Sequence, residues 1–225
     1  MTDENLKLAV VVSQPFGENT YVLWRGESKE CLIVDPGFEP DKITALVDQE
    51  GLTPAAILNT HGHADHIAGN EAMKQQWPEC PLVIGAGDEP KLTDAALNLS
   101  AGYGISLVSP PADETVVEGK VYKAAGIELE VLEIPGHSIG HIVFVWKAAQ
   151  PWMVIGGDVL FQGSIGRTDF PDGSFEDLRD SIWQKLFTLP DDTIVLPGHG
   201  PETTIKAERV ANPFVGEPAG YQAQT

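Results

Sequence analysis

The chain has 225 residues and a formal net charge of −19 at pH 7. Nucleic acid and anionic membranes repel so negative a chain, which argues against either as a partner. An apolar share of 42% and a charged share of 21% are typical of a globular protein and exclude a fibrous or disordered one. No repeat or linker divides the sequence, so we expect one domain over residues 1–225.

The sequence predicts a cytoplasmic protein. Cys31 and Cys80 are its only cysteines, too few for a disulfide framework, and we expect a buried strand residue and a loop residue, respectively. The first ten residues lack the basic segment and the apolar run of a secretory signal. No segment has the roughly 20 apolar residues that a transmembrane helix needs.

The first half is predicted to mix strands and helices. Short apolar runs bounded by turn-forming residues predict strands at 6–12, 19–24, 31–35, 55–60 and 82–86. A helix is predicted over 41–50, because apolar residues recur there at helical spacing, with Asp41 as its N-cap and Gly51 as its C-cap. A second helix is expected over 67–76.

The second half is richer in strands. Residues 88–100 are helical in composition but interrupted by Pro90, and 101–120 are typical of a long surface loop. Strands are predicted at 127–134, 141–146, 152–157 and 193–197, and helices at 174–188 and 202–210. Two sheets with helices on their outer faces, an αββα sandwich of the α/β class, would use all of these elements.

Three of the six histidines fall within six residues, His61-Gly62-His63-Ala64-Asp65-His66, directly after a predicted strand. A lone histidine is usually a packed or exposed imidazole, but three with an interleaved aspartate predict a metal site. Imidazole and carboxylate are ligands of divalent metals such as zinc. Because a loop presents alternate residues to different sides, His61 and His63 would face one ion, and Asp65 and His66 another.

Three further candidate ligands follow predicted strands. His137, Asp158 and His199 each stand beside Gly or Pro residues that let the backbone turn sharply. Alone, Asp158 would more often be a turn residue or a helix cap. The histidines already present in such motifs favour a shared cleft that all of these side chains enter.

In this order, the motifs resemble the metallo-β-lactamase superfamily of metallohydrolases, whose αββα fold agrees with the predicted elements. The segments Pro135-Gly136-His137-Ser138-Ile139-Gly140-His141 and Leu196-Pro197-Gly198-His199-Gly200-Pro201 are most similar to short bacterial members of the glyoxalase II group, the hydroxyacylglutathione hydrolases. The resemblance implies two metal ions. Their ligands would be His61, His63 and His137 for the first, and Asp65, His66 and His199 for the second, with Asp158 bridging the two.

The same resemblance implies a small-molecule thioester, S-D-lactoylglutathione or a relative, as substrate. Two metals lower the pKa of a shared water, so a bridging hydroxide would attack the thioester carbonyl and a thiol would leave. Asp65 and Asp158 are our candidate catalytic residues. We expect Zn²⁺, with iron and manganese as alternatives.

Other residues are candidates for supporting roles. Full-length glyoxalase II has an additional helical domain whose basic residues bind glutathione, whereas only residues 200–225 follow His199 here, with Lys206 as one candidate contact. Arg167 is suited to a substrate carboxylate or to a structural pair with a nearby acid. Tyr103 is a candidate from its loop position alone. Asp35 and His141 are candidates for hydrogen bonding to the metal ligands.

Two other functions are open. Gly166-Arg167-Thr168-Asp169-Phe170 resembles a segment of persulfide dioxygenases, which share the fold and use one iron at the positions of His61, His137 and Asp158. A metal-stabilised binding module without catalysis is the third reading, but such modules usually lack ligands, and none of the seven is missing here.

Overall fold

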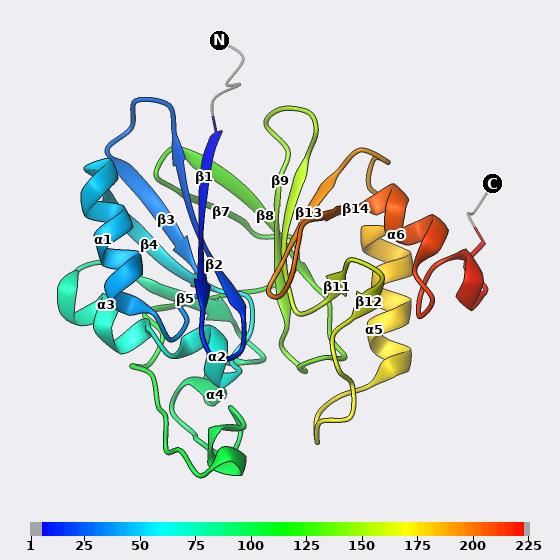
Figure 1. Cartoon of the computed structure of the whole chain (residues 1–225), viewed down its shortest axis with the longest axis horizontal. Helices are drawn as coiled ribbons and strands as arrows, with labels where there is room; N and C mark the ends of the chain where they lie inside the picture. Colours follow the sequence, from blue (N-terminus) through cyan, green and yellow to red (C-terminus); the bar gives the residue numbers. More distant parts are fainter. Residues whose placement is uncertain (1–5, 223–225) are drawn as a thin grey trace.

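Two six-stranded sheets form the centre of the computed structural model, which describes residues 6–222 (Figure 1). The first sheet has the order β1 (Leu6–Ser13), β2 (Glu18–Arg25), β3 (Glu30–Val34), β4 (Thr53–Asn59), β5 (Leu82–Gly85) and β6 (Glu114–Val116). The second has the order β14 (Thr203–Thr204), β13 (Ile194–Pro197), β10 (Met153–Gly157), β9 (Ile142–Trp146), β8 (Ile127–Glu133) and β7 (Val121–Ala124). β11 (Leu160–Phe161) and β12 (Ser164–Ile165) form a short separate hairpin.

Both sheets are mixed, as the sequence predicts. In the first, β1, β2 and β3 are antiparallel, and β3 to β6 run parallel. In the second, β10 and β13 are parallel and the other neighbours are antiparallel.

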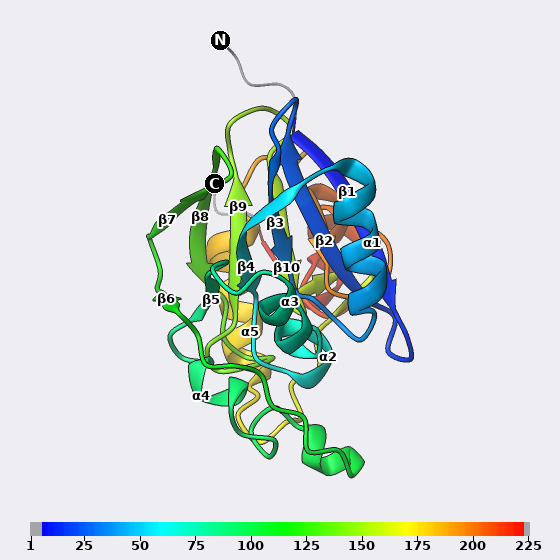
Figure 2. The same ribbon diagram turned by 90° about the vertical axis from the view of Figure 1, so that its left-hand side faces the viewer.

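Helices cover the outer face of each sheet. Figures 1 and 2 show α1 (Pro40–Glu50) and α3 (Asn70–Gln76) against the first sheet, and Figure 1 shows α5 (Phe175–Ser181) and α6 (Ile205–Ala211) outside the second. This arrangement confirms the predicted αββα sandwich.

Alternating side chains of the central strands build the layers. On β3, Leu32 and Val34 join the core between the two sheets, and Cys31 and Ile33 join the core under α1 and α3. Because successive residues of a strand point to opposite faces, a strand covered on both sides reads as one continuous apolar run. The prediction for Cys31 is confirmed; Cys80, in a loop, is also buried.

The helix ends correct several predictions. α1 begins at Pro40, whose fixed φ suits a first helical position, so the N-cap position falls on Glu39 and not on Asp41. Its predicted end is confirmed, because Gly51 adopts a left-handed φ of 64°. The helix expected over 67–76 is two helices, α2 (Ala64–Ile67) and α3, because Gly69 packs against the Pro36 carbonyl and donates its N–H to it at 2.7 Å.

Other predicted segments are divided differently. The region 88–100 contains α4 (Glu89–Leu92) and the first residue of a 3₁₀ turn, and the expected loop 101–120 contains β6. The helix predicted over 174–188 is α5 followed by a π-helical turn, Ile182–Leu186. Two short 3₁₀ turns, Ser100–Tyr103 and Glu217–Ala219, complete the helical elements. α6 begins at Ile205 because the two residues before it pair with β13 as β14.

The strand directions bring the loops that follow several strands to one edge of the sandwich. β3, β4, β8, β10 and β13 all end at this edge, and β2 begins there, so the loops that follow five strands converge (Figure 1). Among the described residues, no helix combines the length and the apolar character that crossing a bilayer requires.

Candidate metal centre

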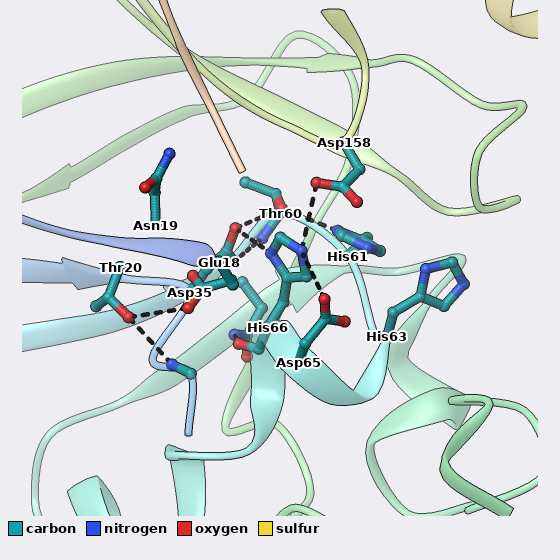
Figure 3. Close-up of polar contacts among 12 residues, drawn as sticks. Glu18, Asn19, Thr20, Asp35, Thr60, His61, His63, Asp65, His66 and Asp158 are labelled. Atoms are coloured by element: carbon teal, nitrogen blue, oxygen red, sulfur yellow. Dashed lines mark hydrogen bonds and ion pairs between the residues drawn. The ribbon is translucent and has the colours of Figure 1, made fainter. Parts of the chain in front are cut away.

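The seven predicted ligand side chains lie together at this edge. Figure 3 shows His61, His63, Asp65 and His66, which follow β4, facing Asp158, which follows β10. His137 and His199 come from the loops after β8 and β13. The centre therefore lies where the two sheets meet, with ligands from both.

The donor atoms fall into three overlapping trios. Within each trio they all lie within 4.8 Å of one another. The trios are His61, His63 and His137; His61, His66 and Asp158; and Asp65, His66 and His199. The first and third match the two ligand sets that the sequence resemblance implies, and the second joins them.

Asp158 stands between the two sets. Its Oδ2 lies 3.5 Å from His137 Nε2 on one side and 3.5 Å from His199 Nε2 on the other, and its Oδ1 lies 3.3 Å from His66 Nε2. Asp65 Oδ2 is 3.3 Å from His199 Nε2. A carboxylate so placed is suited to bridging two cations.

Hydrogen bonds fix the ring tautomers. Nδ1 of His137 lies 2.8 Å from the Arg167 carbonyl and Nδ1 of His199 lies 3.2 Å from the Phe16 carbonyl. A carbonyl only accepts, so each Nδ1 carries the proton and each Nε2 is the ring nitrogen that faces the centre. Nδ1 of His66 likewise donates to Asp35 at 3.1 Å.

Unpartnered polar atoms show that the centre fits metal ions. Nε2 of His61, His63 and His66 and Oδ1 of Asp158 are buried without a hydrogen-bond partner. Such atoms are rare in proteins, because leaving each of them unpaired costs about 1–3 kcal/mol. Divalent cations would give these lone pairs partners, and nitrogen and oxygen donors suit zinc, iron or manganese. The residues present therefore fit the divalent ions that the fold implies.

The electrostatics favour the ligand protonation state at most of the candidate ligands. At His66 and His199, although burial opposes it, Asp65 and Asp158 raise the pKa instead. Burial lowers the pKa values of four buried histidines, namely His61, His63, His137 and His141. Burial alone would raise the pKa of Asp158, but His66, His137 and His199 outweigh it and hold that pKa well below its usual range. Neutral imidazoles and an ionised carboxylate are the forms that bind cations.

Asp35 and His141 support the centre from behind. Asp35 accepts hydrogen bonds from the Thr60 N–H and hydroxyl, both at 2.7 Å, and from His66 Nδ1 (Figure 3). His141 stacks on the His61 ring and its Nε2 accepts the Asp158 N–H at 3.0 Å. These contacts place both residues beside candidate ligands, and their supporting role stays a prediction.

A cavity of about 310 Å³ opens onto the centre. Its walls are mostly apolar and aromatic, with Phe16, Phe38, Tyr103, Phe161 and Phe170 among them. The Phe16 ring lies 5.7 Å from Phe38 and 5.8 Å from Tyr103. Candidate ligands, among them His63, Asp65 and Asp158, form its floor. A small molecule would thus contact apolar walls while one end reaches the ligands.

The basic candidates differ in position. Arg167 lines the cavity, where it donates two hydrogen bonds to Asp169, at 2.9 and 2.8 Å, and lies over the Phe170 ring. The carboxylate pair considered from the sequence is therefore present. Lys206 is not brought to the cavity: its ammonium is exposed and lies 3.7 Å from Asp191.

Comparison with known proteins agrees with this geometry. The family model described as the metallo-beta-lactamase superfamily matches residues 13–199, which include all seven ligand positions. The chain belongs to the metallo-β-lactamase superfamily.

Relatives place this superfamily member among the metallo-hydrolases. It is 43% identical over 202 residues to the probable metallo-hydrolase YqgX of Bacillus subtilis, covering 89% of this chain and 93% of the relative. It is 35% identical over 213 residues to hydroxyacylglutathione hydrolase GloC of Haemophilus influenzae, covering 93% and 98%.

Solved structures of the superfamily resemble the chain closely. BLEG-1, described as a B3 metallo-β-lactamase, matches with a TM-score of 0.88 and 36% identity over 93% of this chain and 99% of that one. TTHA1623, solved in a di-iron-bound form, matches with a TM-score of 0.79 and 36% identity over 92% and 99%.

The structure also adds residues to this superfamily site that sequence reasoning missed. Glu18 is fully buried and its Oε2 lies 3.3 Å from the Thr20 hydroxyl (Figure 3). Burial raises the pKa of Glu18 well above its usual range, although His66 acts in the opposite direction. Asp88 and Lys91, also buried, contact the loops that carry His61 and His137. Neither Glu18 nor the pair of Asp88 and Lys91 belongs to a local cluster of possible ligands, so the sequence did not single them out.

Proposed function

We propose that the chain is a metal-dependent thioesterase of the hydroxyacylglutathione hydrolase type, acting on S-D-lactoylglutathione or a related thioester. The observation that carries the proposal is the complete set of seven ligands, arranged as two trios joined by Asp158, beneath a cavity of small-molecule size. The relative named hydroxyacylglutathione hydrolase, 35% identical over nearly its whole length, supports the choice of thioester.

The chain's own residues have distinct roles in this proposal. His61, His63 and His137 would hold one ion, and Asp65, His66 and His199 the other, with Asp158 between them. Such ions lower the pKa of water to about 7 and polarise a carbonyl oxygen, so no separate side-chain base is needed. The rings are held in the ligand tautomer by Asp35 and by the carbonyls of Arg167 and Phe16.

The cavity walls would bind the part of the substrate that does not react. Phe16, Phe38 and Tyr103 form an aromatic wall, and Phe170 lies 5.1 Å from the His63 ring on the metal side. Apolar contact there would orient the thioester so that its carbonyl carbon faces the floor of the cavity. The reaction adds water to this carbon and releases a carboxylic acid and a thiol.

A persulfide dioxygenase with one iron is the second candidate. It is favoured by the segment 166–170, whose Arg167 and Phe170 line the cavity beside His137. The two functions differ in metal content and in co-substrate.

The test is metal analysis followed by two assays on the same sample. We expect about two divalent ions per chain, thiol release from S-D-lactoylglutathione, loss of that activity on chelation and its recovery with Zn²⁺, Fe²⁺ or Mn²⁺. One iron per chain, with oxygen consumed in the presence of glutathione persulfide and no thioester turnover, would overturn the proposal in favour of the dioxygenase. Two tightly bound ions without either activity would support the metal centre but refute the thioester assignment.

A further inference from the structure

A buried polar cluster lies beneath the first metal set, at the start of α4. It consists of Asp88, Lys91 and Ser138, which are at most 4% exposed, together with the half-buried Asp172. None of these side chains belongs to the seven ligands. The cluster fills the space between the loop that carries His61 and His63 and the loop that carries His137.

Asp88 binds both of these loops. Its Oδ2 accepts the Gly62 N–H at 2.8 Å and the Ser138 hydroxyl at 2.5 Å, and its Oδ1 accepts the Gly140 N–H at 2.8 Å. Gly62 lies between the ligands His61 and His63, and Ser138 directly follows the ligand His137. One carboxyl group thus connects two loops that are about 75 residues apart in the sequence, as His63 and His137 are 74 apart.

Both loops pack tightly against the start of α4 beside Asp88. A Cβ on Gly62 would come within 2.5 Å of Lys91 Cβ, and a Cβ on Gly140 within 2.1 Å of the Asp88 backbone nitrogen. Neither neighbour is the free end of a flexible side chain. The backbone of both loops therefore rests directly on the start of α4, and only glycine fits at these two contacts.

Lys91 completes the cluster and connects it to Asp172. Its ammonium hydrogen-bonds to Ser138, lies 3.5 Å from Asp88 Oδ1 and pairs with Asp172 Oδ2 at 2.6 Å. Asp172 also accepts the Ile139 N–H at 3.2 Å. A buried charge with all of its hydrogen-bonding partners in place rigidifies its surroundings, whereas the loss of one partner leaves the others unpaired.

We propose that Asp88 is a positioning residue that sets the spacing of the first metal site, by fixing the loop of His61 and His63 against the loop of His137. The distance it controls is short, because His63 Nδ1 and His137 Nε2 are 2.8 Å apart. Altering a hydrogen-bonding partner of a ligand side chain usually changes metal affinity by about 10- to 100-fold, and we expect an effect of this order from Asp88, which holds the backbone of the ligand loops. The inference rests on the metal-centre part of the proposed function and not on its substrate.

The central test is Asp88→Asn, which keeps the side-chain shape but replaces one acceptor oxygen with a donor. Either the Gly140 N–H or the pair formed by the Gly62 N–H and the Ser138 hydroxyl then loses its acceptor. We expect about a 10- to 100-fold weaker affinity for one of two Zn²⁺ ions, measured by competition with a chromophoric chelator, and an unchanged affinity for the other. The visible spectrum of the Co²⁺-substituted protein should change for that one ion only.

Asp113→Asn is the matched control. Asp113 also accepts a backbone N–H, from Leu82 at 2.8 Å, and pairs with a lysine, Lys74, at 2.9 Å, but it contacts none of the ligand loops. We expect both Zn²⁺ affinities of this variant to equal those of the wild type. A decrease equal to that of Asp88→Asn would assign the effect to general loss of stability and overturn the proposal.

A second variant covers the case in which Asp88→Asn fails to fold. Ser138→Ala removes one of the three donors to Asp88 and retains the carboxyl group, so a smaller weakening of the same Zn²⁺ site is expected. Folded variants that bind both ions as tightly as the wild type would refute the positioning role. Because Zn²⁺ and Co²⁺ alone are the probes, the result does not depend on whether the chain hydrolyses thioesters.

Discussion

Replacement of Asp35 tests how far the support behind the second metal site contributes to stability and metal binding. Asp35 is 1% exposed and adopts a left-handed φ of 51°, a region that asparagine tolerates far better than alanine. Asp35→Asn therefore changes the hydrogen bonds while leaving the backbone unstrained. Asp35→Ala removes the hydrogen bonds and also strains the backbone.

The expected magnitudes follow from the three hydrogen bonds that Asp35 accepts. In Asp35→Asn the amide oxygen still accepts the Thr60 N–H, and the Thr60 hydroxyl can turn to accept from the amide, but His66 Nδ1 faces a donor. Loss of one hydrogen bond to a charged group lowers the free energy of unfolding by about 1.5–3 kcal/mol. Asp35→Ala loses all three, at about 1.5–3 kcal/mol each, or about 4.5–9 kcal/mol.

Urea unfolding of the metal-free protein measures these differences. With a slope of about 2 kcal/mol per molar urea, the midpoint of Asp35→Asn should fall by about 1 M. Because His66 loses the acceptor that orients it, affinity for the ion at Asp65, His66 and His199 should also fall, by about 10- to 100-fold. Asp94→Asn serves as the control, since this exposed side chain only caps two backbone N–H groups of its own turn.

Two outcomes would contradict the reasoning about Asp35. An unfolding midpoint within error of the wild type would mean that the buried hydrogen bonds contribute nothing net. An unchanged metal affinity would mean that the His66 ring is oriented by its packing alone.

Three further predictions concern pH and the cavity. The histidines whose pKa values are lowered, His61, His63, His137 and His141, stay neutral in the metal-free fold but take up protons near pH 6.5 in the unfolded chain. Their contribution to the free energy of unfolding is therefore present above that pH and is lost as the pH falls below it. Although burial opposes it, carboxylates raise the pKa values of His66 and His199, which work in the opposite direction. With four groups against two, metal-free protein should show a lower urea midpoint at pH 5.5 than at pH 7, and an equal or higher midpoint would refute this balance. Tyr103→Ala should raise KM for an apolar thioester by about 2- to 10-fold with little change in kcat, as expected for loss of an aromatic contact. Lys206→Ala should change kcat/KM less than twofold, because Lys206 lies outside the cavity lining; a large decrease in thioester assays would place it in substrate binding.

Sequence could identify the candidate ligands because each belongs to a short, local pattern. His61, His63 and His66 lie within six consecutive residues, and His137 and His199 follow apolar strands beside glycine. The fold class followed from the same apolar runs, whose length and order are local properties. The structure brings these side chains together at the ends of strands that the sequence itself predicts.

The remaining features depend on contacts between distant residues. β6, β7 and β14 are two to four residues long, and their pairing partners in the sheets define them more than their own composition does. Asp88 contacts Gly62, 26 residues away, and Ser138, 50 residues away. No local spacing reports such contacts, and composition cannot distinguish Asp88 from an exposed turn aspartate.

The origin of the ligands in both sheets has a consequence for folding. His61, His63, Asp65 and His66 follow a strand of the first sheet, and His137, Asp158 and His199 follow strands of the second, so bound ions would tie the two halves of the sandwich together. A chelator would then act on this fold as a reductant acts on a protein crosslinked by a disulfide, by removing a tie between segments far apart in the chain. Metal supply would set the lifetime of the folded protein against proteases as well as its capacity for chemistry.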